Sequence, residues 1–424
     1  MRYKKLQFNT GAAMITAVVF FLFISITAIL GVATPAVRGV KIARGIEYSK
    51  ASFYTAESLA EDSVFRLVKG LSISNNETLT LNNATANLVV SDVSGGKEVV
   101  IVGDKDNLIR KIQARVLTGD GVTFNYGIQA GDGGFDIKNT ASIEGNAFSN
   151  GPVTGSNSNL ITGDVISAGP NGLINGLNIS GNAFSHTIQN SSVLGNAYYQ
   201  SIVNTSVSGD SFPGSNNQAT GTMPISDELI QSWKDVAESG GVSTSCTISN
   251  TVTIGPKKYN CSKLEIKGSA NVTVAGHIWV NGNIEFENTA TISVDQSLGS
   301  QSVAIIAHDS SNESSSGIIT AKNSVAFNGP NNNYILLVSM NKSEANGGGT
   351  PAIEAENTIN GDLLLYAPYG RVILKNSINL KEVTAYTIEL QNSAQVIYET
   401  GLVNLLFTSG PSGGFSLDSW GESE

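Results

Sequence analysis

The chain begins with an almost uncharged apolar stretch that follows a short basic leader. Arg2, Lys4 and Lys5 open the sequence, and no charged residue follows until Arg38. A helix of about 20 residues spans the roughly 30 Å apolar core of a bilayer. The stretch therefore predicts one membrane-spanning helix. A cleaved secretory signal is the alternative, although the apolar core of a signal peptide is usually only about 7–15 residues long.

Beyond this stretch, the pattern becomes that of an amphipathic helix. Apolar residues recur mostly at spacings of three, four and seven between Arg38 and Lys69, and Gly70 suits the position just after a helix end. The sequence thus predicts one helix over residues 12–70, with a transmembrane part and an amphipathic part. The amphipathic part is suited to packing against other helices.

Period-two alternation replaces the helical pattern after residue 70. Thr78–Leu81 and Lys111–Leu117 alternate between polar and apolar residues, and a β-branched run covers Val99–Val102. Residues 71–120 are therefore predicted to form a small β meander of three strands.

A short glycine-containing unit then repeats along the chain. It begins at Gly145, Gly163, Gly181, Gly195 and Gly209, in steps of 18, 18, 14 and 14 residues, with Asn or Asp after each glycine. Short strand-like repeats at such steps are typical of a parallel β-helix, in which equivalent side chains stack from coil to coil. Asparagine also suits the corners of coils and can form amide ladders between them. An antiparallel β-sandwich with Gly/Asn turns is the alternative.

The predicted fold is therefore mainly β: a long N-terminal helix, a small β unit and a parallel β-helix (solenoid). The repeats divide it into a first β-helical segment over 121–212, a loop-and-helix insertion over 213–245, and a second segment over 246–408. The insertion is expected to cover a flank of the solenoid or to link its two segments. The Gly/Ser-rich tail, 409–424, is expected to fold back as a cap through Trp420.

Composition excludes several functions. Charged residues make up 14% of the chain and the net charge is −10, which disfavours nucleic acid as a partner. Three histidines and two cysteines leave little for metal or haem ligation, so no cofactor and no metal ligand is assigned.

The two cysteines, Cys246 and Cys261, lie fifteen residues apart. Adjacent coils of a β-helix would bring them within the Cα separation of about 5.5 Å that a disulfide needs. A disulfide is the preferred interpretation if this region is extracytoplasmic, where oxidising conditions prevail. Two buried thiols are the alternative.

A catalytic site is not predicted. Polysaccharide lyases and hydrolases need clustered carboxylates and usually a neighbouring Lys or Arg. The sequence has no Lys or Arg between Lys138 and Lys234, and its acids between Thr140 and Ser226 are limited to Glu144, Asp164 and Asp210. No catalytic residue is therefore named.

The N-terminal motifs resemble those of type IV pilins, most closely the minor pilins of the PilX type. The resemblance rests on Thr10–Thr16 after the basic leader and on Ser52–Glu61, which is similar to the Phe-x-x-Ala-Glu-x-Ala segment of those proteins. It implies that a prepilin peptidase cuts between Gly11 and Ala12, removing a leader over 1–11. It also implies a cytoplasmic leader and an extracytoplasmic remainder. Thr16 stands where major pilins carry Glu, which favours a tip or anchored role over a bulk filament subunit.

These patterns predict a non-enzymatic, single-pass inner-membrane protein that projects a β-helical stalk or adhesin at the cell surface or in a pilus. Its expected partners are the membrane, other pilin-like subunits, the prepilin peptidase and a carbohydrate or protein surface. Tyr198, Tyr199 and Trp279 are the candidate ligand contacts, with packing between coils as the alternative role. Two other functions stay open. One is a structural cell-envelope polymer, since the coils are similar in composition to bactofilin repeats, and the other is a glycan-active enzyme.

Overall fold

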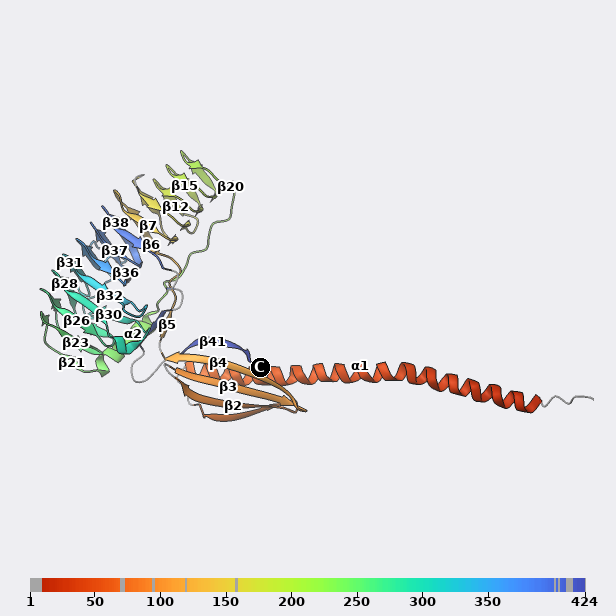
Figure 1. The fold of residues 1–424 in the computed structure, drawn as a ribbon. Helices are drawn as coiled ribbons and strands as arrows, with labels where there is room; N and C mark the ends of the chain where they lie inside the picture. Colours follow the sequence, from red (N-terminus) through yellow and green to blue (C-terminus); the bar gives the residue numbers. More distant parts are fainter. Residues whose placement is uncertain are drawn as a thin grey trace, which may run out of the picture. The chain divides into compact units, whose positions relative to one another are not determined.

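The computed structural model describes residues 10–68, 73–93, 96–118, 120–156, 159–399, 402, 405–408 and 415–423. The chain divides into two compact units (Figure 1). The first unit contains Met1–Leu117 and Leu417–Glu424, and the second contains Thr118–Ser416. In the sequence, the second unit is therefore an insertion into the first.

The first unit is built on one long helix, α1 (Thr10–Val68), which continues through Pro35. Its N-terminal part is apolar and exposed; for example, 73% of the surface of Phe21 is accessible. By length and composition, this helix is capable of crossing a membrane. The predicted helix over 12–70 is thus present, and Lys69 and Gly70 at its expected end lie outside the described residues.

An antiparallel sheet packs on the C-terminal part of α1. The sheet has the order β1-β2-β3-β4-β41, with bounds β1 Asn76–Leu81, β2 Ala84–Val93, β3 Gly96–Lys105, β4 Leu108–Thr118 and β41 Phe415–Ser423. The meander has four strands where three were predicted. Both turn residues of Asn82-Asn83 and of Asp106-Asn107 have positive φ, as type I′ hairpin turns require.

Small residues bring the helix and the sheet together. Ala56 and Ala60 are fully buried in α1, and Ser52 Oγ donates to the Leu108 carbonyl at 2.6 Å. A Cβ on Gly103 of β3 would lie 2.2 Å from the Ser52 carbonyl oxygen. Glycine at this position is therefore what allows β3 to lie directly against the helix.

The C-terminal tail does not cap the β-helix, so that expectation is wrong. Instead, β41 joins the sheet of the first unit beside β4, and Arg110 pairs with Glu422 at 2.8 Å. A sheet edge can pair with any strand of suitable length, and the alternation of polar and apolar residues does not specify which strand that is.

The second unit is a parallel β-helix, which confirms the predicted fold and excludes the antiparallel sandwich. In the first segment a coil contains three short strands, as in β7, β8 and β9, and each pairs in parallel with its equivalent in the next coil. The strands of this segment are β6 Ile128–Ile137, β7 Ser142–Glu144, β8 Ala147–Ser149, β9 Val153–Gly155, β10 Leu160–Ile161, β11 Val165–Ser167, β12 Leu173–Asn175, β13 Asn178–Ile179, β14 Ala183–Ser185, β15 Thr187–Gln189, β16 Ser192–Val193, β17 Ala197–Tyr199, β18 Ser201–Val203, β19 Ser206–Val207 and β20 Ser211–Pro213.

The second segment repeats this architecture with longer coils. Its strands are β21 Val242–Ser243, β22 Thr247–Ile248, β23 Val252–Ile254, β24 Lys257–Tyr259, β25 Lys263–Ile266, β26 Asn271–Val274, β27 Ile278–Val280, β28 Asn283–Glu287, β29 Thr291–Val294, β30 Val303–Ala307, β31 Ile319–Lys322, β32 Ala326–Asn328, β33 Ile335–Ser339, β34 Ile353–Glu356, β35 Asn360–Gly361, β36 Leu363–Lys375, β37 Asn379–Leu380, β38 Glu382–Gln391 and β39 Gln395–Ile397. A 3₁₀ turn, η1 (Gln296–Leu298), lies between β29 and β30.

The spatial order of the coils differs from their order in the chain. One face of the β-helix is a 12-stranded sheet with the order β19-β16-β13-β10-β7-β39-β37-β35-β32-β29-β26-β23. The chain therefore begins the β-helix near its middle, and the coils of the first segment stack from there toward one end. The chain then crosses to the opposite end, and the coils of the second segment stack from that end back to the middle (Figure 1). At this junction the last coil of the second segment pairs in parallel with the first coil of the first segment, β38 with β6 and β39 with β7.

An asparagine ladder crosses the junction without a break. Asn139 donates its side-chain amide to Asn392, and Asn392 donates to Asn376, at 2.8 and 2.7 Å. The ladder continues through Asn357 to Asn323, and all five residues have φ between 57° and 68°. Asparagine tolerates this left-handed conformation, and its side-chain amide both donates and accepts hydrogen bonds. The same asparagines therefore form the corners of the coils and the amide ladder, as predicted.

The Gly-[Asn/Asp] units form a second ladder in the first segment. Asn146 Oδ1 accepts from the amide of Asp164, and Asp164 Oδ1 accepts from the amide of Asn182, at 2.8 and 2.7 Å. A Cβ on Gly163 would lie 2.4 Å from Asn146 Oδ1. The glycine is therefore needed because the neighbouring coil occupies the space of a side chain.

The insertion both links the two segments and covers a flank. Its extended part runs along the first segment, where Gln200, Asn150 and Gln129 donate side-chain amides to its carbonyl groups at 2.7–2.9 Å. It leads into α2 (Asp227–Ser239), which Ser226 caps and which packs on β24 and β27.

Among its described residues, the second unit has two apolar cores. One fills the inside of the coils. The other lies outside them, where α2, the strands β5 (Asp120–Val122) and β40 (Leu405–Phe407), and neighbouring residues cover β30, β33 and β36. Strands β5 and β40 pair antiparallel, so the chain enters and leaves this unit side by side.

Candidate functional site

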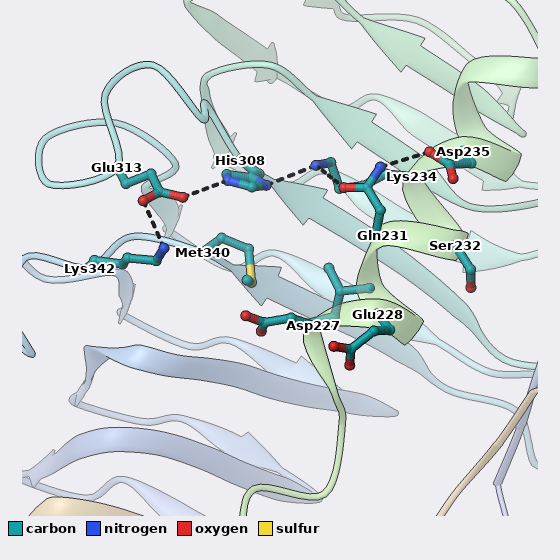
Figure 2. Close-up of a pocket in the computed structure, with 11 residues that line it drawn as sticks. Asp227, Glu228, Gln231, Ser232, Lys234, Asp235, His308, Glu313, Met340 and Lys342 are labelled. Atoms are coloured by element: carbon teal, nitrogen blue, oxygen red, sulfur yellow. Dashed lines mark hydrogen bonds and ion pairs between the residues drawn. The ribbon is translucent and has the colours of Figure 1, made fainter.

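A pocket of about 500 Å³ opens between α2 and the loops that follow β30 and β33 (Figure 2). Helix α2 contributes Asp227, Glu228, Gln231, Ser232, Lys234 and Asp235, and the β-helix contributes His308, Glu313, Met340 and Lys342. Because acids and bases line both sides of one cavity, this pocket is the first place to look for chemistry.

A chain of polar contacts crosses the pocket (Figure 2). Lys234 Nζ donates to His308 Nδ1 at 3.0 Å, and His308 Nε2 lies 3.2 Å from Glu313 Oε1. Lys342 Nζ completes the chain at 2.7 Å from Glu313 Oε2. Since an ammonium group can only donate, His308 Nδ1 is the acceptor and its proton sits on Nε2, pointing at Glu313.

Burial and neighbouring charges shift the pKa of each of these groups. Burial lowers the pKa of Lys234, and burial followed by the nearby Lys234 cation lowers the pKa of His308. The hydrogen bond from Lys342 lowers the pKa of the Glu313 carboxyl. A neutral His308 between an ammonium and a carboxylate satisfies all three.

The arrangement is better suited to holding α2 against the β-helix than to catalysing a reaction. Lys234 is buried and engaged with Gln231 and His308, while Tyr369 donates its hydroxyl to Asp227 at 2.6 Å. A nucleophile or general base needs a free side toward a substrate. Among the described residues, no cluster of three or more His, Cys, Asp or Glu side chains is placed to hold a metal ion.

A fully buried carboxyl lies outside this pocket. Glu382, at the start of β38, is fully buried, and burial raises its pKa well above the usual range. One of its oxygens accepts from the Thr384 hydroxyl, whereas the other has no hydrogen-bond partner among the residues that the structure describes. A carboxyl without access to solvent can stabilise packing but cannot reach a substrate.

Trp279, one of the predicted ligand contacts, lies on β27 beside α2. Its indole N–H donates to the His308 carbonyl at 3.1 Å, and the Nζ atoms of Lys234 and Lys258 lie 4.4 and 3.8 Å from the ring centroid. Lys234 belongs to α2 and Lys258 to the neighbouring coil, so Trp279 packs against both by cation–π contacts. Its role as a ligand contact stays a prediction.

The two tyrosines have different positions. Tyr199 points into the coil and is 9% exposed, so the expectation that it contacts a ligand is wrong. Tyr198 lies on the outer face between Phe184 and Phe212, with ring centroids 4.5 and 4.6 Å apart and planes within 6° of parallel. Because neighbouring rings cover both faces of Tyr198, a sugar has no free face on which to stack.

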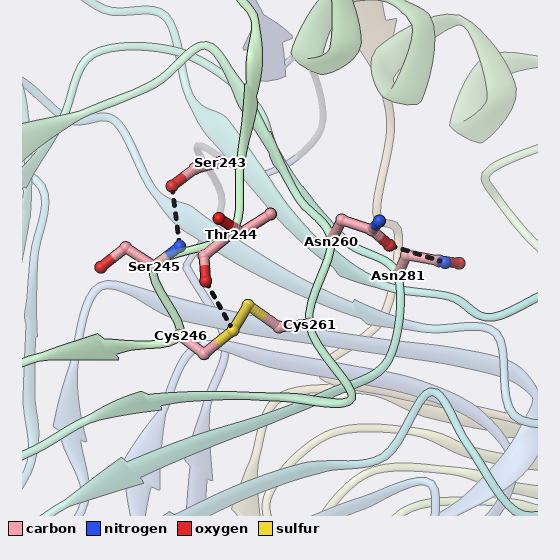
Figure 3. Close-up of a disulfide and its surroundings, with 7 residues drawn as sticks. All are labelled: Ser243, Thr244, Ser245, Cys246, Asn260, Cys261 and Asn281. Carbon is pink, nitrogen blue, oxygen red and sulfur yellow. Dashed lines mark hydrogen bonds between the residues drawn. A yellow bond between two sulfur atoms is a disulfide. The ribbon is translucent and has the colours of Figure 1, made fainter.

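The disulfide between Cys246 and Cys261 is present (Figure 3). The two Cα atoms are 5.8 Å apart, close to the separation expected for neighbouring coils. Cys246 precedes β22 and Cys261 precedes β25, and these strands pair in parallel. The bond therefore ties the coil at one end of the β-helix to the coil above it.

We expect replacement of both cysteines by serine to lower the free energy of unfolding of the second unit by about 3 kcal/mol. Cross-linking across fifteen residues removes roughly that much chain entropy from the unfolded state. Urea denaturation of wild type and of the double Cys246→Ser, Cys261→Ser variant measures the difference. A wild type that loses no stability on treatment with a reductant would contradict the prediction.

Gly11 and Ala12 lie in the first turn of α1, and cleavage between them stays a prediction.

Sequence reasoning missed the pocket and the outer core. A signal for the outer core was present, because Val303–Ala307 and Ile335–Ser339 are nearly continuous apolar runs and are buried at every position. Such runs indicate a strand that is covered on both faces.

No family model matches the chain, and no curated protein matches it. Among solved structures, the competence-associated pilin ComZ from Thermus thermophilus aligns over 89% of this chain and 97% of its own. The sequence identity is 11% and the TM-score 0.22. Similarity at this level carries no argument about function.

Proposed function

We propose that the protein is a non-enzymatic, pilin-like surface protein, anchored in the inner membrane by α1 and carrying an extracytoplasmic β-helix. The observation that carries this proposal is the division of α1. Its N-terminal part, exemplified by Phe20 and Phe21, exposes apolar side chains, whereas its C-terminal part buries Ala56 and Ala60 under an antiparallel sheet. A bilayer or neighbouring helices would cover the exposed part.

The finer assignment is to the minor pilins of the PilX type. It is supported by the leader motif around Gly11 and by the segment Ser52–Glu61, part of which forms the buried face of α1. With Thr16 where major pilins have Glu, a tip or anchored position suits this chain better than a place in the filament shaft.

The β-helix is proposed to act by binding rather than by turnover. No Lys or Arg lies between Lys138 and Lys234, and four ionisable groups of the pocket beside α2 are engaged with one another, namely Lys234, His308, Glu313 and Lys342. Its outer faces instead present amide and hydroxyl groups, which suit a carbohydrate or protein surface.

Mass spectrometry and N-terminal sequencing of the protein from its native membrane test the proposal. We expect the mature chain to start at Ala12, shortened by eleven residues. A Gly11→Asp variant should keep its leader, whereas Asn9→Asp, which adds the same charge upstream, should be processed normally. A wild-type chain that starts at Met1 or near Ala36 would remove the pilin pathway, while leaving the β-helix as described.

A further inference from the structure

A cluster of cations lies on α1 just after its apolar part. Arg38, Lys41 and Arg44 form this cationic cluster, and all three are exposed. No charged residue lies between Lys5 and Arg38, and the first acid of the helix is Glu47. The apolar stretch is therefore followed by three positive charges that no acid interrupts.

The cationic cluster has no compensating charge within the protein. Residues three apart are neighbours on a helix surface, so its members lie along one side of α1 over about 9 Å. Among the described residues, none of the three makes a hydrogen bond or an ion pair through its side chain. By contrast, Arg66 of the same helix pairs with Glu77 at 2.6 Å. The charge of the cluster is thus available to a partner.

The helix geometry places the cationic cluster at the surface of a bilayer. The twenty residues from Met14 to Ala33 suffice to cross the apolar core of about 30 Å, and Arg38 lies about 7.5 Å farther along. That distance falls in the headgroup layer. Tyr48, whose ring centroid lies 5.2 Å from Lys105 Nζ, already belongs to the part that the antiparallel sheet covers. The cluster therefore lies between the membrane core and the sheet.

We propose that the cationic cluster binds the headgroups of anionic phospholipids, in the leaflet that the C-terminal end of the span reaches. This inference rests on the proposed membrane anchor and names the lipid that the anchor prefers. Guanidinium and ammonium groups donate charge-assisted hydrogen bonds to phosphate oxygens. A zwitterionic headgroup carries its own cation, which opposes such binding, whereas an anionic headgroup keeps a net negative charge.

The charges of the chain select this partner. A Lys or Arg near the membrane surface favours an anionic lipid by roughly fivefold. Arg44 lies about 9 Å beyond Arg38, which is about one Debye length at physiological salt, and long cationic side chains reach back toward the headgroups. The whole chain has a net charge of −10 and is not expected to be attracted to an anionic surface. A preference for anionic lipid therefore has to come from local cations such as these.

Electron paramagnetic resonance of spin-labelled lipids tests the proposal. The full-length chain is reconstituted into phosphatidylcholine vesicles that contain traces of labelled phosphatidylglycerol or labelled phosphatidylcholine. We expect wild type to associate with phosphatidylglycerol at least about threefold more strongly than with phosphatidylcholine at low salt, and salt should weaken this preference. The triple variant Arg38→Gln, Lys41→Gln, Arg44→Gln should lose at least half of it.

Two variants serve as controls. Arg38→Lys with Arg44→Lys keeps the charge at the same positions, so it should keep the preference. Glu47→Gln removes the nearest acid of the helix and should strengthen the preference. The leader cations Arg2, Lys4 and Lys5 are unchanged in every variant, so the differences report on the cationic cluster alone.

Equal association of wild type with both lipids would overturn the proposal. A preference that survives in the triple glutamine variant, or one that is lost in the lysine variant, would overturn it as well. A chain that does not enter the vesicles, as flotation with them would reveal, would overturn the membrane anchor and this inference together. A chain that enters without lipid preference would overturn this inference alone, so the two failures are distinguishable.

Discussion

Replacing Trp233 by alanine is expected to lower the free energy of unfolding of the second unit by about 3–5 kcal/mol. Trp233 is a fully buried residue of α2, with its ring centroid 4.8 Å from that of Phe407 and 5.2 Å from that of His277. It therefore joins the insertion, the C-terminal exit strand and the β-helix. Removing the indole leaves a cavity that three separate parts of the chain would have to fill.

Urea denaturation followed by circular dichroism measures this effect. Trp420→Ala is the control, because Trp420 is 38% exposed and belongs to the first unit. We expect that variant to stay within about 0.5 kcal/mol of wild type. If Trp233→Ala releases α2 in hydrogen exchange while the main transition does not move, the outer core is not part of the cooperative unit, and the prediction fails.

Acidification is expected to destabilise the same region through His277. Burial lowers the pKa of His277 from its ordinary value to about 4, and its Nδ1 accepts from the amide of Ala304 at 2.9 Å. An unfolded chain binds a proton at this residue near pH 6.5, whereas the folded chain does not until about pH 4. Stability is therefore unaffected by His277 above pH 6.5 and falls as the pH drops from 6.5 to 4, by on the order of 3 kcal/mol.

Denaturation curves at a series of pH values between 7 and about 4 test this expectation. A His277→Gln variant keeps a hydrogen-bond acceptor near Ala304 but has no group that titrates. It should be less stable than wild type at neutral pH and should lose less stability on acidification. Equal losses in wild type and variant would show that other groups cause the acid sensitivity.

The local elements of this protein could be read from its sequence. The apolar stretch and the helical spacing predicted α1, because a helix is specified by residues three and four apart. The Gly-[Asn/Asp] units around Gly163 and Gly181 predicted parallel coils, because each coil repeats the same close approach and the same corner. The pairing of Cys246 with Cys261 followed from the step between coils.

The candidate sites were predicted less well, because exposure depends on neighbours that are distant in the chain. Tyr198 and Tyr199 are adjacent, yet one faces outward into an aromatic stack and the other faces the core. Trp279 is held by Lys234 of α2, and the pocket beside it brings together residues more than seventy positions apart. No spacing in the sequence encodes these contacts.

The sequence by itself determined the kinds of element: one long apolar helix, an antiparallel meander and stacked parallel coils. Only the tertiary structure decided how they connect. It places Ile388 of β38 beside Phe135 of β6, so that the coils do not follow chain order, and it adds β41 to the sheet of the first unit. The physical reason is that every coil edge and every sheet edge presents the same backbone N–H and C=O groups, whichever strand forms it. Periodicity therefore specifies that an edge must be paired, while size, side-chain stacking and chain length select its partner.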